Sequence, residues 1–299
     1  MAPSLQVDFM GIGAPKCGTT WLFYALGQHP DICLSEPKEP RYFSRTDFCT
    51  PSSHGNNEPL ASDRNELTDL AWYARHYRHC GPDSVKGEFS TDYMYNECAP
   101  ARIHRYFPNI KLLVCLRNPV DWAYSWYSAR RDYYKGTTFQ TFEDQLDYDP
   151  GFLYVGYYAK YLKNYLTYFA KEQIKIIQFD DIARQPEQTL RDLFRFLALD
   201  PEVPLDLSLV PRNTTKRSRF VSPVPLMKWF SAWMIEHNQA KLLRKIRNLG
   251  LDNMILRLTT VDSTREPMNQ QTRERLQQLY SDEIDELESL FGLDLAAWK

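Results

Sequence analysis

The feature that most constrains the fold is a short apolar strand that leads through a glycine-containing loop into a helix. The apolar run from Val7 to Ile12 predicts a buried strand, and the residues of WLFYAL recur with helical spacing. This helix should end between Gly27 and Pro30. The loop between them reads GAPKCGTT. A strand that turns through glycine into a helix leaves the first helical N–H groups unpaired at the positive end of the helix dipole, so the segment predicts an anion site.

Strand and helix patterns alternate along most of the remaining chain. This order predicts an α/β fold: a P-loop-like, three-layer arrangement with a central parallel sheet and helices on both faces. The further strands are expected at 85–89, 111–116 and 174–181, and the helices at 67–79, 101–107, 120–131, 157–170, 186–199 and within the last 35 residues. We expect loops at 44–66 and 132–151. We treat residues 1–299 as a single domain with a helical, basic insertion at about 212–265.

The composition is that of an ordinary globular protein and argues against several classes. Of the 299 residues, 43% are hydrophobic and 25% are charged, and the net charge is −2. A charge so close to neutral argues against general nucleic-acid binding, which depends on neutralising phosphates. No apolar run approaches the ~20 residues that span a bilayer. The first residues also lack the pattern of a secretory signal.

The cysteines give no sign of a metal site. The chain has six cysteines, all in its first 115 residues, and they form no C-x-x-C pair. We therefore expect reduced, mostly buried thiols in a cytoplasmic protein. They are Cys17, Cys33, Cys49, Cys80, Cys98 and Cys115.

The loop between the first strand and helix carries residue types that bind phosphate-like anions. Lys16 adds a positive charge, and the hydroxyls of Thr19 and Thr20 add donors to the N–H groups of the helix start. Gly13 and Gly18 have the G-x-x-x-x-G spacing of a Walker A loop, but Thr19 stands where that motif requires lysine. The lysine lies inside the loop instead, where its ammonium group can reach a bound anion.

A second anion-binding candidate follows the apolar strand at 111–116. Arg117 stands at the carboxyl end of this strand, where doubly wound sheets bind their ligands. The forked donors of arginine match a phosphate group. Ser125 lies eight residues further along, on the following helix.

Together these motifs resemble those of the sulfotransferases that use 3′-phosphoadenosine 5′-phosphosulfate (PAPS), and most closely their heparan-sulfate-type and soluble bacterial branch. The segment PKCGTTWL is similar to the family's 5′-phosphosulfate loop, and LRNPVDWAYSWY is similar to its 3′-phosphate motif. The likeness extends over residues 7–215 and 268–298. It implies a PAPS donor, no metal, and a donor site formed by Pro15, Lys16, Cys17, Gly18, Thr19, Thr20, Trp21, Arg117 and Ser125.

The resemblance also implies a catalytic base. In this branch a glutamate followed by x-x-aromatic-Phe takes the proton of the acceptor, and Glu39 in EPKEPRYF matches it. Glu36 is the local alternative. The branch places a second lysine in the strand after this segment, but Phe89 occupies that position here. Lys86 and Glu88 lie nearby, and a share of Glu88 in the base role stays open.

A basic segment, NTTKRSR, follows the last strand–helix unit. The family often closes over the 3′-phosphate with a basic segment in this region, so the resemblance implies Lys216 and Arg217 as further nucleotide ligands; a solvated turn is the alternative. Residues 222–250 combine aromatic and basic side chains at helical spacing. Three roles stay open for this segment: a lid over the acceptor, a helix that contacts a membrane, and plain packing on the core. Substitutions of Trp229 and Trp233 distinguish these roles.

These features lead to one expected function and two alternatives. The expected activity is in-line transfer of a sulfuryl group from PAPS to a hydroxyl or amine, with Glu39 as base and Lys16 stabilising the leaving phosphate oxygen. The alternatives are a P-loop nucleotide kinase or triphosphatase, with Asp180 or Asp181 as magnesium ligand, and a catalytically inactive nucleotide-binding module. The acceptor is expected to be a small molecule or a glycan, and a homodimer stays open. Neither a nucleic-acid partner nor a transmembrane segment is expected.

Overall fold

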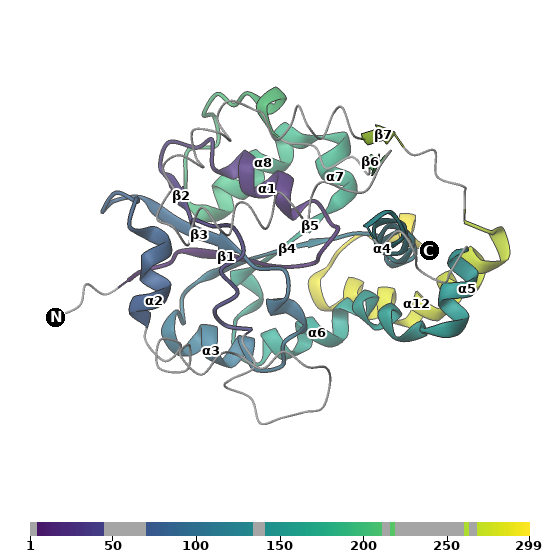
Figure 1. The fold of residues 1–299 in the computed structure, drawn as a ribbon. Helices are drawn as coiled ribbons and strands as arrows, with labels where there is room; N and C mark the ends of the chain where they lie inside the picture. Colours follow the sequence, from purple (N-terminus) through teal and green to yellow (C-terminus); the bar gives the residue numbers. More distant parts are fainter. Residues whose placement is uncertain (1–4, 45–69, 134–140, 211–215, 219–259, 263–267) are drawn as a thin grey trace, which may run out of the picture. The chain divides into compact units, whose positions relative to one another are not determined.

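The computed structural model describes residues 5–44, 70–133, 141–210, 216–218, 260–262 and 268–299 (Figure 1). The chain divides into two compact units, which are described separately. The first comprises residues 1–123, 151–213 and 271–299, and the second comprises residues 124–150 and 214–270. Two predicted segments lie outside the described residues. They are the loop at 44–66, apart from Ser44, and the segment with Trp229 and Trp233.

The first unit is built on a parallel sheet of five strands in the order β2-β3-β1-β4-β5. All of the neighbouring strands pair in parallel, and Gly11 of β1 lies between Phe89 of β3 and Leu113 of β4. The predicted α/β class with a central parallel sheet is therefore confirmed. The strands are β1 (Phe9–Gly13), β2 (Ile32–Leu34), β3 (Val85–Phe89), β4 (Lys111–Leu116) and β5 (Ile174–Gln178).

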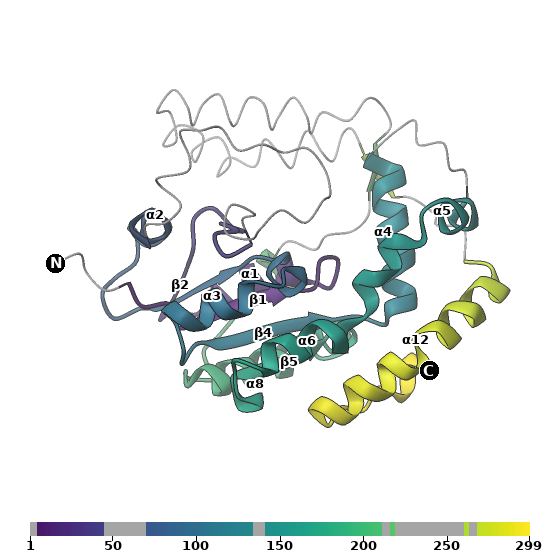
Figure 2. The ribbon, with the colours of Figure 1, turned by 90° about the horizontal axis from the view of Figure 1, so that it is seen from below.

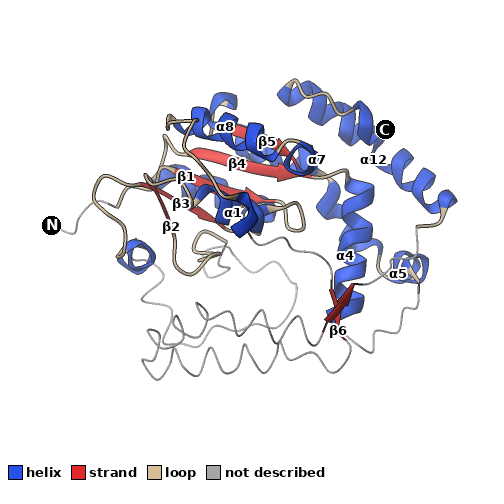
Figure 3. Cartoon of the chain, turned by 90° about the horizontal axis from the view of Figure 1, so that it is seen from above, coloured by secondary structure: helices blue, strands red, loops and turns tan. Residues whose placement is uncertain are grey.

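Helices cover both faces of this sheet, which produces the predicted layers (Figures 1 and 3). One face carries α1 (Thr19–Leu26), α7 (Phe179–Arg184) and α8 (Pro186–Leu197), and the other carries α3 (Ala99–Tyr106) and α6 (Tyr158–Leu166). The short helix α2 (Leu70–Ala74) continues into a 3-10 turn, Arg75–Tyr77. Within the described part of the chain, none of the helices has the length and apolar character needed to cross a membrane.

The C-terminal segment returns to the first unit and closes its core. The long helix α12 (Gln270–Phe291) runs past α6 (Figure 2). Its Glu283 accepts the backbone N–H groups of Ala159 and Lys160, so it satisfies donors that the first turn of α6 leaves unpaired. Trp298 near the C-terminus is 1% exposed, and its carbonyl oxygen accepts a hydrogen bond from the Asn118 amide.

The second unit contains a helix that the sequence analysis did not predict. Residues 132–151 were expected to form a loop, but α4 (Pro119–Tyr133) continues into them and α5 (Phe142–Tyr148) lies among them. Thr141 and Asp144 form a reciprocal capping box that starts α5. Phe142 packs against the rings of Tyr124 and Tyr127. With only seven residues, α5 is too short for its apolar spacing to be recognised among so many aromatic residues.

Candidate functional site

The loop between β1 and α1 presents an open helix N-terminus. Gly18 precedes the first turn of α1 with a φ of 87°, a conformation that glycine adopts without steric cost. Its position has no side-chain cap, and the first turn of α1 contains no acidic residue. The N–H of Leu22 is bonded to the Gly18 carbonyl oxygen, so the N–H groups before it have no partner within the helix. These groups and the helix dipole form an anion site of the predicted kind.

Buried bonds to β4 and α4 fix the shape of this loop. The Trp122 indole N–H donates to the Pro15 carbonyl oxygen at 2.7 Å, and the Ala14 N–H donates to the Cys115 carbonyl oxygen at 2.7 Å. The Cys115 thiol donates to the carbonyl oxygen of Cys17. Burial raises the pKa of the Cys17 thiol to about 12, so this side chain is a neutral part of the core. Cys17 can therefore serve an anion only through its backbone.

The remaining predicted loop residues differ in exposure. Lys16 is exposed and has a φ of 64°, while Thr20 and Trp21 are half-buried. The Thr19 side chain is buried, with 5% exposure. The charge of Lys16 and the hydroxyl of Thr20 are therefore the loop's accessible side-chain donors for an anion.

Arg117 lies beside this loop and shares a neighbour with it. Its guanidinium carbon is 4.9 Å from the centre of the Phe179 ring, at the start of α7. A Cβ atom on Gly18 would lie 3.1 Å from the same ring. Phe179 therefore brings the two predicted anion motifs together. The sequence analysis missed this residue because it extended the preceding strand through Asp181, whereas β5 ends at Gln178 and both Asp180 and Asp181 lie in the first turn of α7.

Three predicted donor-site residues belong to the second unit. Ser125 lies on α4 and is buried, with 7% exposure. Lys216 and Arg217 were expected in a basic loop, but their backbone forms the strand β6 (Lys216–Ser218), which pairs antiparallel with β7 (Thr260–Asp262). Alternating backbone hydrogen bonds with a distant segment cannot be recognised from the local sequence of such a short strand.

The candidate base Glu39 lies in a tightly turned segment after β2. Its carboxylate is paired with Lys38 at 2.9 Å and with Arg41 at 2.6 Å, and its side chain is 24% exposed. Partial burial would raise the pKa of Glu39, but the bonds from Arg41 and Lys38 outweigh it and hold that pKa below its usual value. Glu39 is therefore ionised at neutral pH and able to accept a proton.

The other carboxylates near this segment have different surroundings. Glu36 is exposed, and its backbone is held by His76, whose carbonyl oxygen accepts the Glu36 N–H at 3.0 Å. Glu88, for which the sequence analysis left a share of the base role open, is fully buried. Phe89, which replaces the lysine of the resembling branch, is 1% exposed and packs edge-on against Phe23. Phe89 and Glu88 are successive strand residues and lie on opposite faces of the sheet, both of which are buried here.

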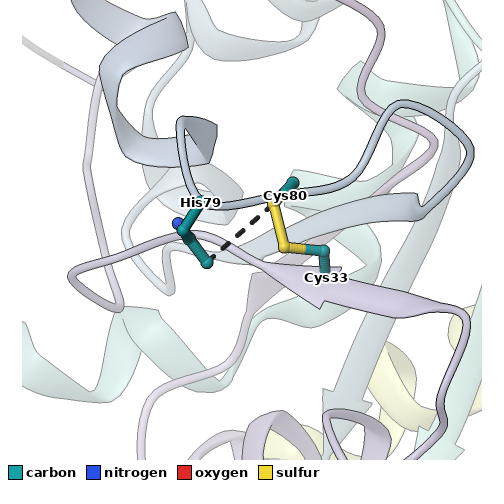
Figure 4. A group of neighbouring side chains, drawn as sticks. All are labelled: Cys33, His79 and Cys80. Atoms are coloured by element: carbon teal, nitrogen blue, oxygen red, sulfur yellow. Dashed lines mark hydrogen bonds between the residues drawn. A yellow bond between two sulfur atoms is a disulfide. The ribbon is translucent and has the colours of Figure 1, made fainter.

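The expectation that the cysteines are reduced is wrong for part of the set. Cys33 and Cys80 form a disulfide, and Cys98 is disulfide-bonded as well, whereas Cys17 and Cys115 are free and buried. Figure 4 shows His79 beside the Cys33–Cys80 bond, with its Nε2 atom 3.9 Å from Cys80 Sγ. These three residues are close enough to share a metal ion. In the disulfide form, however, neither sulfur is a thiolate, which is the form that binds zinc.

The fold and the site together define an α/β protein with a parallel sheet, an anion loop that carries a lysine, and an arginine at the end of the neighbouring strand. A family model for the sulfotransferase domain matches residues 6–245. The chain therefore belongs to the sulfotransferase family. The predicted family and enzyme class are confirmed.

Individual relatives agree with this assignment. Carbohydrate sulfotransferase 15 of Rattus norvegicus is 30% identical over 266 residues, which cover 71% of this chain and 47% of that protein. The bifunctional heparan sulfate N-deacetylase/N-sulfotransferase 3 of Homo sapiens is 25% identical over 309 residues, covering 97% of this chain and 31% of that protein. The chain thus spans about half or less of these relatives' lengths.

A solved structure extends the likeness to the whole chain. The crystal structure of a sulfotransferase from Alicyclobacillus acidocaldarius has a TM-score of 0.69 and 27% sequence identity. The match covers 98% of this chain and 99% of that one. The arrangement of sheet and helices is therefore that of a sulfotransferase.

Proposed function

We propose that this protein transfers the sulfuryl group of PAPS to a hydroxyl or amine acceptor. The observation that carries the proposal is the open N-terminus of α1, with Lys16 exposed in its loop and Arg117 joined to the same loop through Phe179. Two separate cationic positions match a donor with two separate phosphate groups. The loop would bind the 5′-phosphosulfate through its N–H groups, and Arg117 would bind the 3′-phosphate.

The transfer is a displacement at sulfur. The acceptor oxygen or nitrogen forms a bond to sulfur while the bond from sulfur to the 5′-phosphate oxygen breaks. The acceptor proton goes to Glu39, and the leaving oxygen of adenosine 3′,5′-bisphosphate (PAP) keeps the electron pair. Lys16 stabilises the negative charge that develops on that oxygen. Catalysis on this scheme consists of alignment, general-base action and electrostatic stabilisation.

The ion pairs of Glu39 give the acceptor a defined place to bind. Arg41 is 59% exposed and donates to Glu39 Oε2, so an acceptor hydroxyl can replace it without disturbing the core. Losing this partner would raise the pKa of Glu39 and make it a stronger base when the acceptor is present. The relatives named for carbohydrate and heparan sulfate substrates support a carbohydrate acceptor, and a small-molecule alcohol is the alternative.

The decisive experiment combines turnover with binding. Labelled PAPS is incubated with panels of glycans, amino sugars and small alcohols, and the products are identified by mass. We expect sulfated product with wild-type protein and a ~10²–10⁴-fold lower kcat in Glu39→Gln with unchanged PAP affinity. Glu36→Gln is the matched control and should stay active. PAP binding without any turnover would instead support an inactive module, and magnesium-dependent ATP binding would support a kinase.

Several further expectations stay predictions. They are the single domain with its insertion, the lack of a metal requirement and a homodimer. The cytoplasmic location also stays a prediction, and the Cys33–Cys80 disulfide weighs against it because such bonds rarely persist in reducing compartments.

A further inference from the structure

The fully buried carboxylate of Glu88 lies behind the segment that carries the candidate base. Glu88 is on β3, and three hydroxyl groups donate to its carboxylate. Tyr73 donates at 2.5 Å and Tyr93 at 3.0 Å to Oε1, and Ser90 donates at 2.8 Å to Oε2. A buried carboxylate without such donors would be strongly destabilising, so this hydroxyl shell allows the charge to be present.

Two of these hydroxyls also hold the backbone of the base segment. Ser90 Oγ accepts the N–H of Arg41 at 3.1 Å, and the Tyr93 hydroxyl accepts the N–H of Phe43 at 3.4 Å. A hydroxyl has one proton to donate. Because Glu88 takes that proton from both groups, their lone pairs are directed toward the two backbone N–H groups.

The base segment needs such restraint because its backbone is strained. Glu39 has a φ of 60° and Arg41 a φ of 55°, both in the left-handed region that residues other than glycine rarely adopt. Such a conformation persists only where the surroundings hold it in place. A further bond joins the Phe43 carbonyl oxygen to Arg102 at 2.8 Å. The bonds at Arg41 and Phe43 therefore fix the direction in which Glu39 leaves the backbone.

We propose that Glu88 is a positioning residue for Glu39, acting through the hydroxyls of Ser90 and Tyr93. This role rests on the proposed function of Glu39 as base. Glu88 does not contact the acceptor in this scheme, since its side chain is fully buried. Burial raises the pKa of Glu88 to about 7, although the hydrogen bonds from its three hydroxyl donors act in the opposite direction. Replacing Glu88 by glutamine would remove a costly buried charge, so its effects on stability and on the base segment can differ.

The test compares hydroxyl and carboxylate variants within the same cluster. Glu88→Gln weakens both links, Ser90→Ala removes the link to Arg41, and Tyr93→Phe removes the link to Phe43. Tyr77→Phe is the matched control, because the Tyr77 hydroxyl bonds to the Tyr73 hydroxyl at 3.1 Å and not to the base segment. Each variant is measured for kcat, acceptor KM, PAP affinity, melting temperature and hydrogen exchange of the amides in residues 38–43.

We expect Glu88→Gln and Ser90→Ala to lower kcat by about 10- to 100-fold, as misplacement of a catalytic group does. Exchange at Arg41 should accelerate in both variants, while PAP affinity and the Tyr77→Phe control stay within twofold of wild type. Unchanged exchange and kcat in Ser90→Ala would overturn the proposal, even if Glu88→Gln failed to fold. Equal losses in Tyr77→Phe would also overturn it, since they would indicate general weakening of the core.

Failure of the proposed function gives a different result. If Glu39→Gln stays active while Glu88→Gln accelerates exchange in residues 38–43 and lowers kcat, Glu39 is not the base but Glu88 still positions the segment. If Glu39→Gln is inactive and Glu88→Gln changes neither quantity, the base assignment holds and the positioning role fails.

Discussion

Arg117 provides a test of the donor site in which the two parts of its role can be separated. Its guanidinium stacks on Phe179, which also lies against Gly18 of the anion loop. Removing Arg117 should therefore loosen Phe179 and the loop that it contacts. We expect this to weaken the binding of any nucleotide by a small amount, about 0.5–1 kcal/mol. A ligand with a 3′-phosphate should lose a charge-assisted interaction in addition, at about 1.5–3 kcal/mol, or roughly 10- to 150-fold in Kd.

The assay is calorimetric titration of wild type and Arg117→Ala with PAP and with adenosine 5′-phosphate, at one fixed ionic strength because salt screens such contacts. These two ligands differ only in the 3′-phosphate, so the ratio of their Kd changes isolates the phosphate contact from the stacking effect. We expect the PAP-to-monophosphate preference to fall by at least tenfold in Arg117→Ala. It should fall only partly in Arg117→Lys, which keeps the charge but loses the forked geometry.

Phe179→Leu is the control, because it removes the ring but leaves the arginine. It should weaken both ligands by a similar, small factor. If Arg117→Ala weakens PAP and the monophosphate equally, Arg117 does not read the 3′-phosphate, and the placement of the donor argued above is wrong.

Three further predictions follow from the same geometry. Lys16→Met should lower kcat by about 10²–10³-fold, as loss of a charge-stabilising group does. The melting temperature should stay nearly unchanged because Lys16 is exposed. A near-normal rate would contradict the role of Lys16. Arg41→Gln should shift the acidic limb of the kcat/KM profile to higher pH, because Glu39 must be ionised to act and the Arg41 bond lowers its pKa; a shift to lower pH would contradict the pairing. Peptide mapping without reductant should recover Cys33 linked to Cys80. Replacing both cysteines by serine should lower the free energy of unfolding by about 4 kcal/mol for a separation of 47 residues. Recovery of free thiols at these positions would contradict the disulfide.

Local sequence patterns were sufficient for the strands of the sheet and for the anion loop. The strands 85–89 and 111–116 were predicted with the bounds that β3 and β4 have, because each is a compact run ended by a change in polarity. The glycine loop was recognised because its strand, turn and helix are contiguous. Its open N-terminus follows from the same order, since nothing in the segment supplies a cap for α1.

The features that the sequence analysis missed depend on contacts that form only when the chain folds. The Cys33–Cys80 bond joins positions 47 residues apart that come close only after β2 pairs with β3. The hydroxyl donors of Glu88 are nearer in sequence, since Ser90 and Tyr93 follow it by two and five residues and Tyr73 precedes it by fifteen, but their hydroxyls meet at its carboxylate only in the folded chain. A glutamate in an apolar strand gives no indication of such partners, so its burial could not be predicted from its neighbours alone.

The strand β3 contacts both the strand that leads into the anion loop and the segment that carries Glu39, and it has Phe89 where the resemblance implies a lysine. Neighbouring strand residues point to opposite faces of the sheet. Phe89 therefore packs against the Phe23 ring, while Glu88 lies among hydroxyl groups. Phe89 fills the space beside Gly11 of β1, where a Cβ atom would lie 2.0 Å from its ring, and so supports the strand that leads into the anion loop. Glu88 supports the base segment from the other face through Ser90. A lysine in place of Phe89 would have to bury its charge against Gly11, so Lys16 in the anion loop is the cation that we propose for the leaving group.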